Sequence, residues 1–174
     1  MTVAESAFLI PQFAPAAAEI VVLCMACVVL VVDLFVADRH RWITYGLCLL
    51  TLLMAAMATA MYVPRETVVT FSGTFISDPL ARVLKLVTYS VTAVVFLYSK
   101  DYLRERELFR GEYYLLGLFA TLGIMVLISA HSMLTVYLGL ELLSLSLYAM
   151  VAFSRDDPVA AESAMKYFVL GAIA

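Results

Sequence analysis

Residues 132–153 read SMLTVYLGLELLSLSLYAMVAF, an apolar run long enough to cross a bilayer, with the acidic residue Glu141 near its middle. A second apolar run begins near Pro158 and carries Lys166 near its middle. A charged side chain at the centre of a bilayer costs roughly 2.5–3.5 kcal/mol on insertion scales, so such residues are rare and usually functional. The two runs therefore predict a membrane protein that moves protons or ions across the membrane.

The composition of the whole chain indicates that the bilayer is its solvent. Of its 174 residues, 64% are hydrophobic and 14% are charged, and the mean hydropathy is +0.99. Soluble domains carry about 25% charged residues. The first basic residue is Arg39, so the positive segment that opens a signal peptide is missing and we expect the first helix to be retained. We expect the lipid bilayer to surround the chain, and no nucleic-acid partner.

Six apolar segments divide the sequence. Crossing about 30 Å of hydrocarbon takes about 20 helical residues, which the first five segments supply. The sixth is still apolar at Ala174, so we expect the chain to be the N-terminal part of a longer protein. We predict an all-α, polytopic transmembrane helix bundle, a single transmembrane domain with five complete helices and the start of a sixth. The predicted helices cover residues 15–37, 42–63, 79–99, 113–130, 132–153 and 158–174.

Lysine and arginine are concentrated in alternate connections, which predicts the orientation of the helices. The poorer side holds Arg65, with Arg82 and Lys85 near it at the start of the third helix. Because positive residues stay on the cytoplasmic side, we expect the richer connections to be cytoplasmic and the N-terminus to be outside. The richer connections hold Arg39, Arg41, Lys100, Arg104, Arg106, Arg110 and Arg155.

Other features predict local structure. Residues 67–76 are rich in β-branched side chains around Ser72 and Gly73, which predicts a small hairpin on the outer side. Gly117 and Thr121 form a pair of small residues suited to close helix packing.

Three charged residues near helix ends are expected to lie at the membrane–water interface. Glu19 and Asp33 lie near the outer and inner ends of the first helix. Lys85 lies near the outer start of the third helix, where we expect it to snorkel to the surface rather than take part in transport. The polar face of the third helix consists of Lys85, Thr88, Thr92 and Ser99.

The helix that carries Glu141 has a polar stripe. Tyr137, Glu141, Ser144 and Tyr148 follow i, i+4, i+7, i+11 spacing and therefore share one face of an otherwise apolar helix. Such a stripe faces protein or water rather than lipid. Two interpretations are open: Glu141 is part of a proton relay, or its carboxylate forms hydrogen bonds that hold helices together.

Lys166 has two interpretations as well. Glu162 is four residues earlier, and i, i+4 ion pairs stabilise helices, so Lys166 can snorkel toward that partner. Alternatively, a desolvated lysine can load and release a proton near neutral pH. The connection between the fifth and sixth helices is short, so these helices are expected to be antiparallel neighbours. That arrangement would bring Glu141 and Lys166 to adjacent depths as an acid–base relay.

The sequence has no phosphate-binding glycine loop, no cysteine set for an iron–sulfur cluster and no pair of haem ligands. Cys24 and Cys27 form a single CxxC pair, which we interpret as packing residues because no second pair completes a metal site. We therefore expect no redox centre and no bound cofactor or metal in this chain, and any redox chemistry to belong to another subunit.

Four stretches carry a family resemblance. The sequence is similar to the N-subunit family of bacterial NADH–quinone oxidoreductase, respiratory complex I, which is one of the antiporter-like families. Related antiporter-like subunits usually have tryptophan where this chain has Leu140. The similar stretches are YLGLELLSLSLYAMVAF at 137–153, AAESAMKYFVLGAIA at 160–174, DPLARVLK at 78–85 and EYYLL at 112–116.

The resemblance implies a full protein of about fourteen helices, of which this chain would be the first part. It places the family's conserved glutamate on Glu141 and its lysine on Lys166. It implies a subunit of an NADH:quinone translocase that couples electron transfer in other subunits to proton pumping. NADH, FMN, iron–sulfur clusters and quinone would bind partner subunits. The partners would be the other antiporter-like and quinone-site membrane subunits, in the bacterial cytoplasmic membrane.

Two alternatives remain open at this stage. The chain could belong to a cation/proton antiporter of the same superfamily. It could also be a structural membrane subunit in which Glu141 and Lys166 only hold helices together.

Overall fold

The computed structural model describes residues 12–36, 40–62, 67–106, 108–154 and 157–173. A 3-10 turn, η1 (Ala14–Ala16), leads into the first of six α-helices in these residues, which also contain one β-hairpin. Five of the described helices are long and apolar enough to cross a membrane, so the predicted all-α transmembrane bundle is confirmed. They are α1 (Ala17–Phe35), α2 (Trp42–Met61), α3 (Pro79–Glu105), α4 (Gly111–Ile128) and α5 (Met133–Val151), and they are followed by the shorter α6 (Pro158–Ile173).

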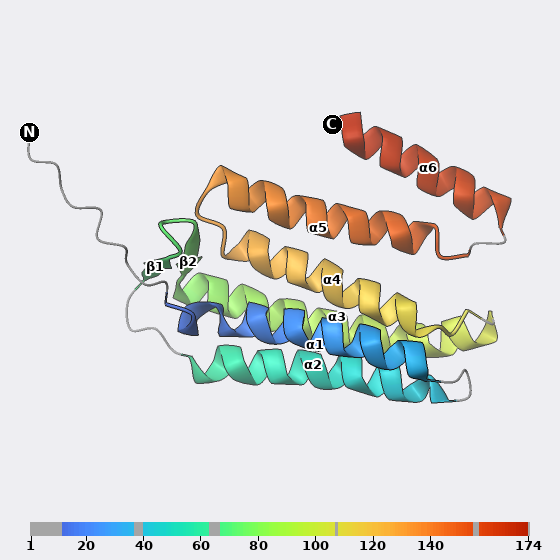
Figure 1. The fold of residues 1–174 in the computed structure, drawn as a ribbon, viewed down its shortest axis with the longest axis horizontal. Coiled ribbons are helices and arrows are strands. Elements are labelled where there is room, and N and C mark those ends of the chain that lie inside the picture. The colour runs from blue at the N-terminus through green and yellow to red at the C-terminus, as the bar shows by residue number, and fades with distance from the viewer. Residues whose placement is uncertain (1–11, 37–39, 63–66, 107, 155–156, 174) are drawn as a thin grey trace, which may run out of the picture.

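The six helices lie side by side with their long axes roughly aligned, and α6 lies at one edge of the bundle against α5 (Figure 1). Helix α4 is central and packs against α1, α2, α3 and α5. Tyr114 of α4 is fully buried, and its ring makes edge contacts with Tyr45 of α2 and Phe96 of α3 at 5.1 and 5.2 Å between centroids. Aromatic edge contacts of this kind add to the dispersion energy that packs membrane helices together.

Glycines allow α4 to approach α5 and α3 closely. A Cβ atom added at Gly123 would lie 2.8 Å from the backbone nitrogen of Leu143, and one at Gly139 would lie 3.1 Å from the carbonyl oxygen of Gly123. The close packing predicted at Gly117 and Thr121 is found against α3: a Cβ at Gly117 would lie 2.5 Å from a ring carbon of Phe96. These contacts need small residues because backbone packs on backbone or ring.

The predicted hairpin is also found. Strands β1 (Val68–Thr70) and β2 (Phe75–Ser77) pair antiparallel, and their turn has left-handed backbone angles, including φ 84° at Gly73. The hairpin joins the α4–α5 turn, because Ile76 N–H donates to the carbonyl of Ser129 at 2.9 Å and His131 N–H donates to the carbonyl of Thr74 at 3.0 Å. The hairpin therefore lies over one end of the bundle (Figure 1).

Helix α3 is longer than the sequence predicts, since it runs to Glu105 instead of ending near Ser99. Leu103 is buried in the core cluster, and its carbonyl accepts a hydrogen bond from Leu108 N–H at 2.9 Å. Leu103 thus belongs to the core although it lies in the charged segment. Hydropathy marks the edge of the apolar segment and not the last helical turn.

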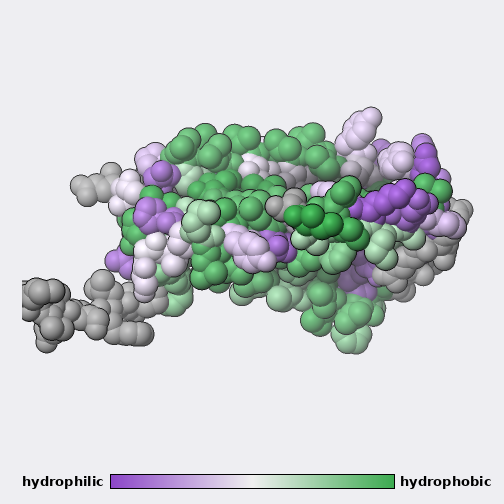
Figure 2. All heavy atoms as spheres, turned by 90° about the horizontal axis from the view of Figure 1, so that it is seen from above, coloured by the Kyte–Doolittle hydropathy of each residue, from purple (hydrophilic) through white to green (hydrophobic). Residues whose placement is uncertain are grey.

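The surface of the bundle suits a bilayer. Apolar residues cover most of the face seen in Figure 2, and many of the hydrophilic residues gather toward the two ends. Arg39, Arg65 and Arg155, on which part of the orientation argument rests, lie outside the described residues. The predicted helix ends at Ala37, Val63 and Ala174 lie outside them as well.

The orientation can be tested by cysteine labelling. Thr67, beside the hairpin, and Arg106, after α3, are both exposed and belong to connections on opposite sides. In a chain whose Cys24, Cys27 and Cys48 are replaced by alanine, we expect Thr67→Cys to react with an impermeant thiol reagent added to intact cells. Arg106→Cys should react only after the cells are opened. The reverse pattern would reject the predicted orientation.

The α4–α5 crossing gives a stability prediction. Gly123→Ala should destabilise the bundle by about 1–3 kcal/mol, because the added methyl meets backbone atoms that cannot turn away. Gly46→Ala is the matched control, because nothing lies within 4 Å of the added Cβ and alanine favours the helix by about 0.5–1 kcal/mol. Thermal unfolding in detergent would measure both. Equal melting temperatures for the two variants would contradict the packing account.

Candidate functional site

Helix α5 places Glu141 well inside the membrane span. Ser132 caps the helix, because its hydroxyl accepts a hydrogen bond from Thr135 N–H at 3.2 Å. Glu141 is then ~13 Å from that end at 1.5 Å per residue. The carboxylate is half-buried, and it pairs with no side chain in the part of the chain that the structure describes.

The residues of the predicted polar stripe differ in how exposed their side chains are. Ser144 and Tyr148 are half-buried like Glu141, whereas Tyr137 is 58% exposed on the surface of this chain. Only Ser144, Tyr148 and Glu141 therefore lie partly inside the described bundle.

Tyr148 joins α5 to α6. Its ring lies edge-on to Tyr167 and Phe168 of α6, with centroid distances of 4.8 and 5.5 Å. Gly171 leaves room for this ring, since a Cβ at that position would lie 1.8 Å from the Tyr148 hydroxyl oxygen. The expected adjacency of the two helices is thus found, and Tyr148 contributes packing to it.

Lys166 lies on α6 and forms an ion pair with Glu162 at 2.5 Å, at i, i+4 spacing. Both side chains are largely exposed in this chain, at 70% and 66%. Lys166 and Glu141 form no ion pair with each other. The structure thus brings their helices together, while the recorded partner of Lys166 is Glu162.

A second acid–base pair lies deeper in the bundle, and the interfacial interpretation of its members is wrong. Lys85 of α3 and Glu19 of α1 form an ion pair at 2.5 Å, and their side chains are only 4% and 9% exposed. The ammonium also lies 5.2 Å from the ring centroid of Phe75 in β2, and the Ser129 hydroxyl lies 3.5 Å from Glu19 Oε1. Lys85 therefore points into the protein and not to the surface.

Seven-residue spacing on α3 is the sequence signal that could have found this pair. Lys85, Thr92 and Ser99 repeat at this spacing, which keeps residues on one face. Thr92 meets Thr121 of α4 at 3.3 Å and Ser99 meets Tyr113 of α4 at 3.1 Å, so this face is turned inward. Thr88, also placed on this face by the sequence, is half-buried, and its hydroxyl donates to the carbonyl of Leu84 in its own helix.

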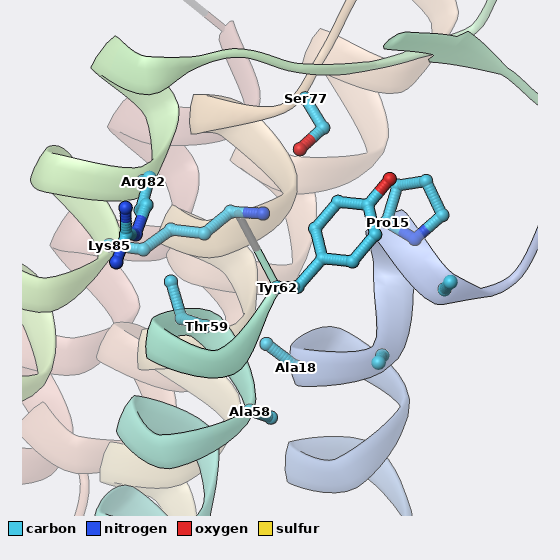
Figure 3. Close-up of a pocket in the computed structure, with 10 residues that line it drawn as sticks. Pro15, Ala18, Ala58, Thr59, Tyr62, Ser77, Arg82 and Lys85 are labelled. Carbon is cyan, nitrogen blue, oxygen red and sulfur yellow. The ribbon is translucent and has the colours of Figure 1, made fainter. Parts of the chain in front are cut away.

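A small cavity of about 20 Å³ lies beside Lys85, between α1, α2 and α3. Figure 3 shows the Lys85 side chain reaching across it from α3 toward Tyr62 and Pro15. Hydroxyl groups of Thr59 and Ser77 are on its wall. In the described ranges, no group of three or more His, Cys, Asp and Glu side chains is placed to hold a metal ion.

Residues 130–174, which contain α5 and α6 with Glu141 and Lys166, match a family model described as NADH:quinone oxidoreductase/Mrp antiporter, transmembrane. This part of the helical membrane bundle is therefore similar to antiporter-like membrane proteins.

Curated relatives match nearly the whole chain. It is 59% identical over 167 residues to NADH-quinone oxidoreductase subunit N of Thioalkalivibrio sulfidiphilus, covering 96% of this chain and 35% of the relative. It is 56% identical over 163 residues to the protein of that name from Thiobacillus denitrificans, covering 94% of this chain and 34% of the relative. It is 53% identical over 174 residues to the protein of that name from Alkalilimnicola ehrlichii, covering 100% of this chain and 36% of the relative.

The chain is therefore a homologue of NADH-quinone oxidoreductase subunit N, and the resemblance seen in the sequence is confirmed. It spans about a third of the length of the curated relatives it matches. With its five apolar spans, it is a multi-pass protein of the bacterial inner membrane.

Proposed function

We propose that this chain is part of a proton-translocating membrane subunit of a respiratory NADH–quinone oxidoreductase. In this proposal, electron transfer in partner subunits changes the electrostatic field along the membrane subunits, and Glu141 and Lys166 pass a proton in response. The relatives that match over nearly the whole chain support this function, since their names are those of a subunit of such an oxidoreductase.

The observation that carries the proposal is that Glu141 is half-buried and has no side-chain partner among the described residues. This residue lies in the interior of an apolar helix. A carboxylate at this depth is costly to keep charged. Holding helices together would require a partner that satisfies it. A carboxyl group without such a partner binds and releases a proton as its surroundings change.

Lys166 is the proposed second member of the relay. By helix rise Lys166 lies ~12 Å from the start of α6, while Glu141 lies ~15 Å from the adjoining end of α5 at Val151. The levels differ by less than one helical turn, which side chains and one water molecule can bridge. We propose Ser144, Tyr137 and Tyr148 as the supporting polar groups of this path, with Glu162 as the ion-pair partner of Lys166.

The redox reaction is proposed to lie in partner subunits. NADH, FMN, the iron–sulfur clusters and the quinone site would belong to those chains, and other antiporter-like subunits would be neighbours in the membrane. The residues of this chain contribute protonatable side chains and packing faces to such a complex.

A second candidate function is cation/proton antiport, which the family model favours because its description also contains the Mrp antiporter. The dependence of transport on sodium ions distinguishes these two functions. Pumping by the assembled complex in vesicles should not depend on sodium concentration if the chain serves a proton-translocating oxidoreductase. Sodium movement coupled to proton movement would favour the antiporter.

Replacement of Glu141 tests the relay directly. Glu141→Gln keeps the size of the side chain but cannot exchange a proton, so we expect proton pumping to fall roughly tenfold or more while the complex still assembles. Glu141→Asp should retain part of the activity, because the carboxylate moves back by one methylene. Glu105→Gln, at the exposed end of α3, is the matched control and should pump normally. Undiminished pumping by Glu141→Gln would reduce this residue to a structural role.

Three variants on α6 decide between the interpretations of Lys166. A relay predicts that Lys166→Arg impairs turnover, because arginine does not deprotonate, while Glu162→Gln has a mild effect. Simple pairing predicts that Lys166→Arg is active and that Glu162→Gln is as harmful as Lys166→Met. We expect the relay pattern, because an exposed ion pair is worth only ~0.3–0.5 kcal/mol. Quinone reduction and pumping in the assembled complex measure it, and full activity of Lys166→Arg would exclude the relay role.

A further inference from the structure

We propose that Glu19 and Lys85 form a second proton-exchange site, which exchanges protons with the aqueous phase on the hairpin side through a water molecule held in the cavity beside Lys85. The proposal deepens the proposed function and rests on it, because exchange here would serve proton translocation by the same subunit. It concerns different residues and different helices from Glu141 and Lys166, because Glu19 and Lys85 belong to α1 and α3 and lie beside the cavity region of Figure 3.

Burial is the first observation. The Lys85 and Glu19 side chains are 4% and 9% exposed, whereas the Lys166–Glu162 pair is largely open. Replacing a buried ion pair by apolar side chains is often neutral or stabilising, so a contribution to stability does not explain why this pair exists. A buried acid and base in contact at 2.5 Å can share a proton with little movement of atoms.

The cavity is the second observation. A volume of about 20 Å³ is enough for one water molecule, which needs at least about 10–15 Å³ and two to four polar partners. Lys85, Arg82 and Ser77 line the cavity and carry polar side-chain groups that can supply these partners, whereas the Thr59 hydroxyl is already bonded to the carbonyl of Ala55 and to Tyr89. The site is therefore polar and large enough to hold a hydrogen-bonded water against Lys85.

Unsatisfied polar atoms are the third observation. Glu19 Oε2 and Arg82 Nε are buried without a hydrogen-bond partner in the described part of the chain. Buried polar atoms of this kind generally bond to protein or to ordered water. Arg82 lines the cavity one turn before Lys85, so a water there also lies near the Arg82 side chain.

The surroundings of the pair contain few other charges. Among the described residues that line the cavity, Arg82 is the one charged side chain besides Lys85. Tyr62 follows α2 on the cavity wall, and Tyr89 of α3 hydrogen-bonds to Thr59 at 3.2 Å. From α4 and β2 the pair meets Ser129 and Phe75, which are uncharged.

The exchange step is balanced. The proton leaves Lys85 Nζ for the cavity water, and that water passes a proton to the solution on the hairpin side. The amine is then neutral beside the Glu19 carboxylate, and the pair carries one negative charge. A proton arriving from the interior of the membrane restores the ammonium, so one proton has entered and one has left.

Conservative replacement of Lys85 tests the proposal in the assembled oxidoreductase in vesicles. Lys85→Arg keeps the positive charge and the partner of Glu19 but does not deprotonate. We expect assembly and melting temperature close to those of the unmodified complex, with the number of protons pumped per NADH reduced at least twofold. Lys100→Arg is the matched control: Lys100 is on the same helix, half-buried, and lies 5.0 Å from the ring centroid of Tyr45, and its replacement should leave the ratio unchanged.

A double variant keeps the test decisive if arginine does not fit. Glu19→Gln/Lys85→Gln replaces the ion pair with two neutral amides that can hydrogen-bond, and a purely structural pair would survive this change with normal pumping. The proposal is overturned if either variant pumps at the unmodified ratio. Failure of both variants to assemble overturns it too, because it assigns the pair to folding.

Thiol labelling tests whether water reaches the cavity from the hairpin side. Ser77→Cys should react in the assembled complex with a small, impermeant thiol reagent added on the hairpin side, and an unreactive thiol would overturn the aqueous route. These results are separable from those for the relay. Normal pumping by Glu141→Gln with reduced pumping by Lys85→Arg rejects the relay alone, and the opposite result rejects the Glu19–Lys85 site alone.

Discussion

Inside a bilayer, a charged side chain must find its partner within the protein, and the ion pair between Lys85 and Glu19 meets this constraint at the centre of several contacts. It connects α1 to α3 directly. Through the Phe75 ring it meets the hairpin, and through Ser129 it meets the end of α4. The hairpin in turn is hydrogen-bonded to the α4–α5 turn, so the start of the helix that carries Glu141 is positioned by the same end of the bundle.

The same constraint accounts for other polar residues between the helices. The Thr44 hydroxyl donates to Asp33 at 2.6 Å, and the Asp33 carboxylate occupies the space that a Cβ at Gly111 would need, at the start of α4. An acidic group at a helix N-terminus is electrostatically favourable. Asp33, which the sequence suggests is merely interfacial, thus bonds to Thr44 of α2 and lies against the start of the central helix. Glu141 differs from these residues, because it has no side-chain partner in the described chain.

Much of the architecture could be predicted from residue type and spacing. Apolar segments of membrane length predicted the bundle, and β-branched residues around Ser72 and Gly73 predicted the hairpin. The true end of α3 could not be predicted, because it depends on the packing of Leu103 against distant parts of the chain. The burial of Lys85 was missed for a similar reason: sequence position gives the depth of a residue in the membrane, but not which helix faces it. The i, i+4 rule did predict the Lys166–Glu162 contact, although spacing alone does not decide what that contact does.

The two acid–base pairs suggest a division of roles along the bundle. One lies near the hairpin and is buried between α1 and α3, and the other belongs to α6, beside the helix with Glu141. Both are proposed to change protonation while the complex turns over. Infrared difference spectroscopy of the assembled complex during NADH oxidation measures this most directly. The account predicts a carboxylic-acid carbonyl band that appears on turnover and is lost in Glu141→Gln. The same band in the unmodified complex and in that variant would contradict it.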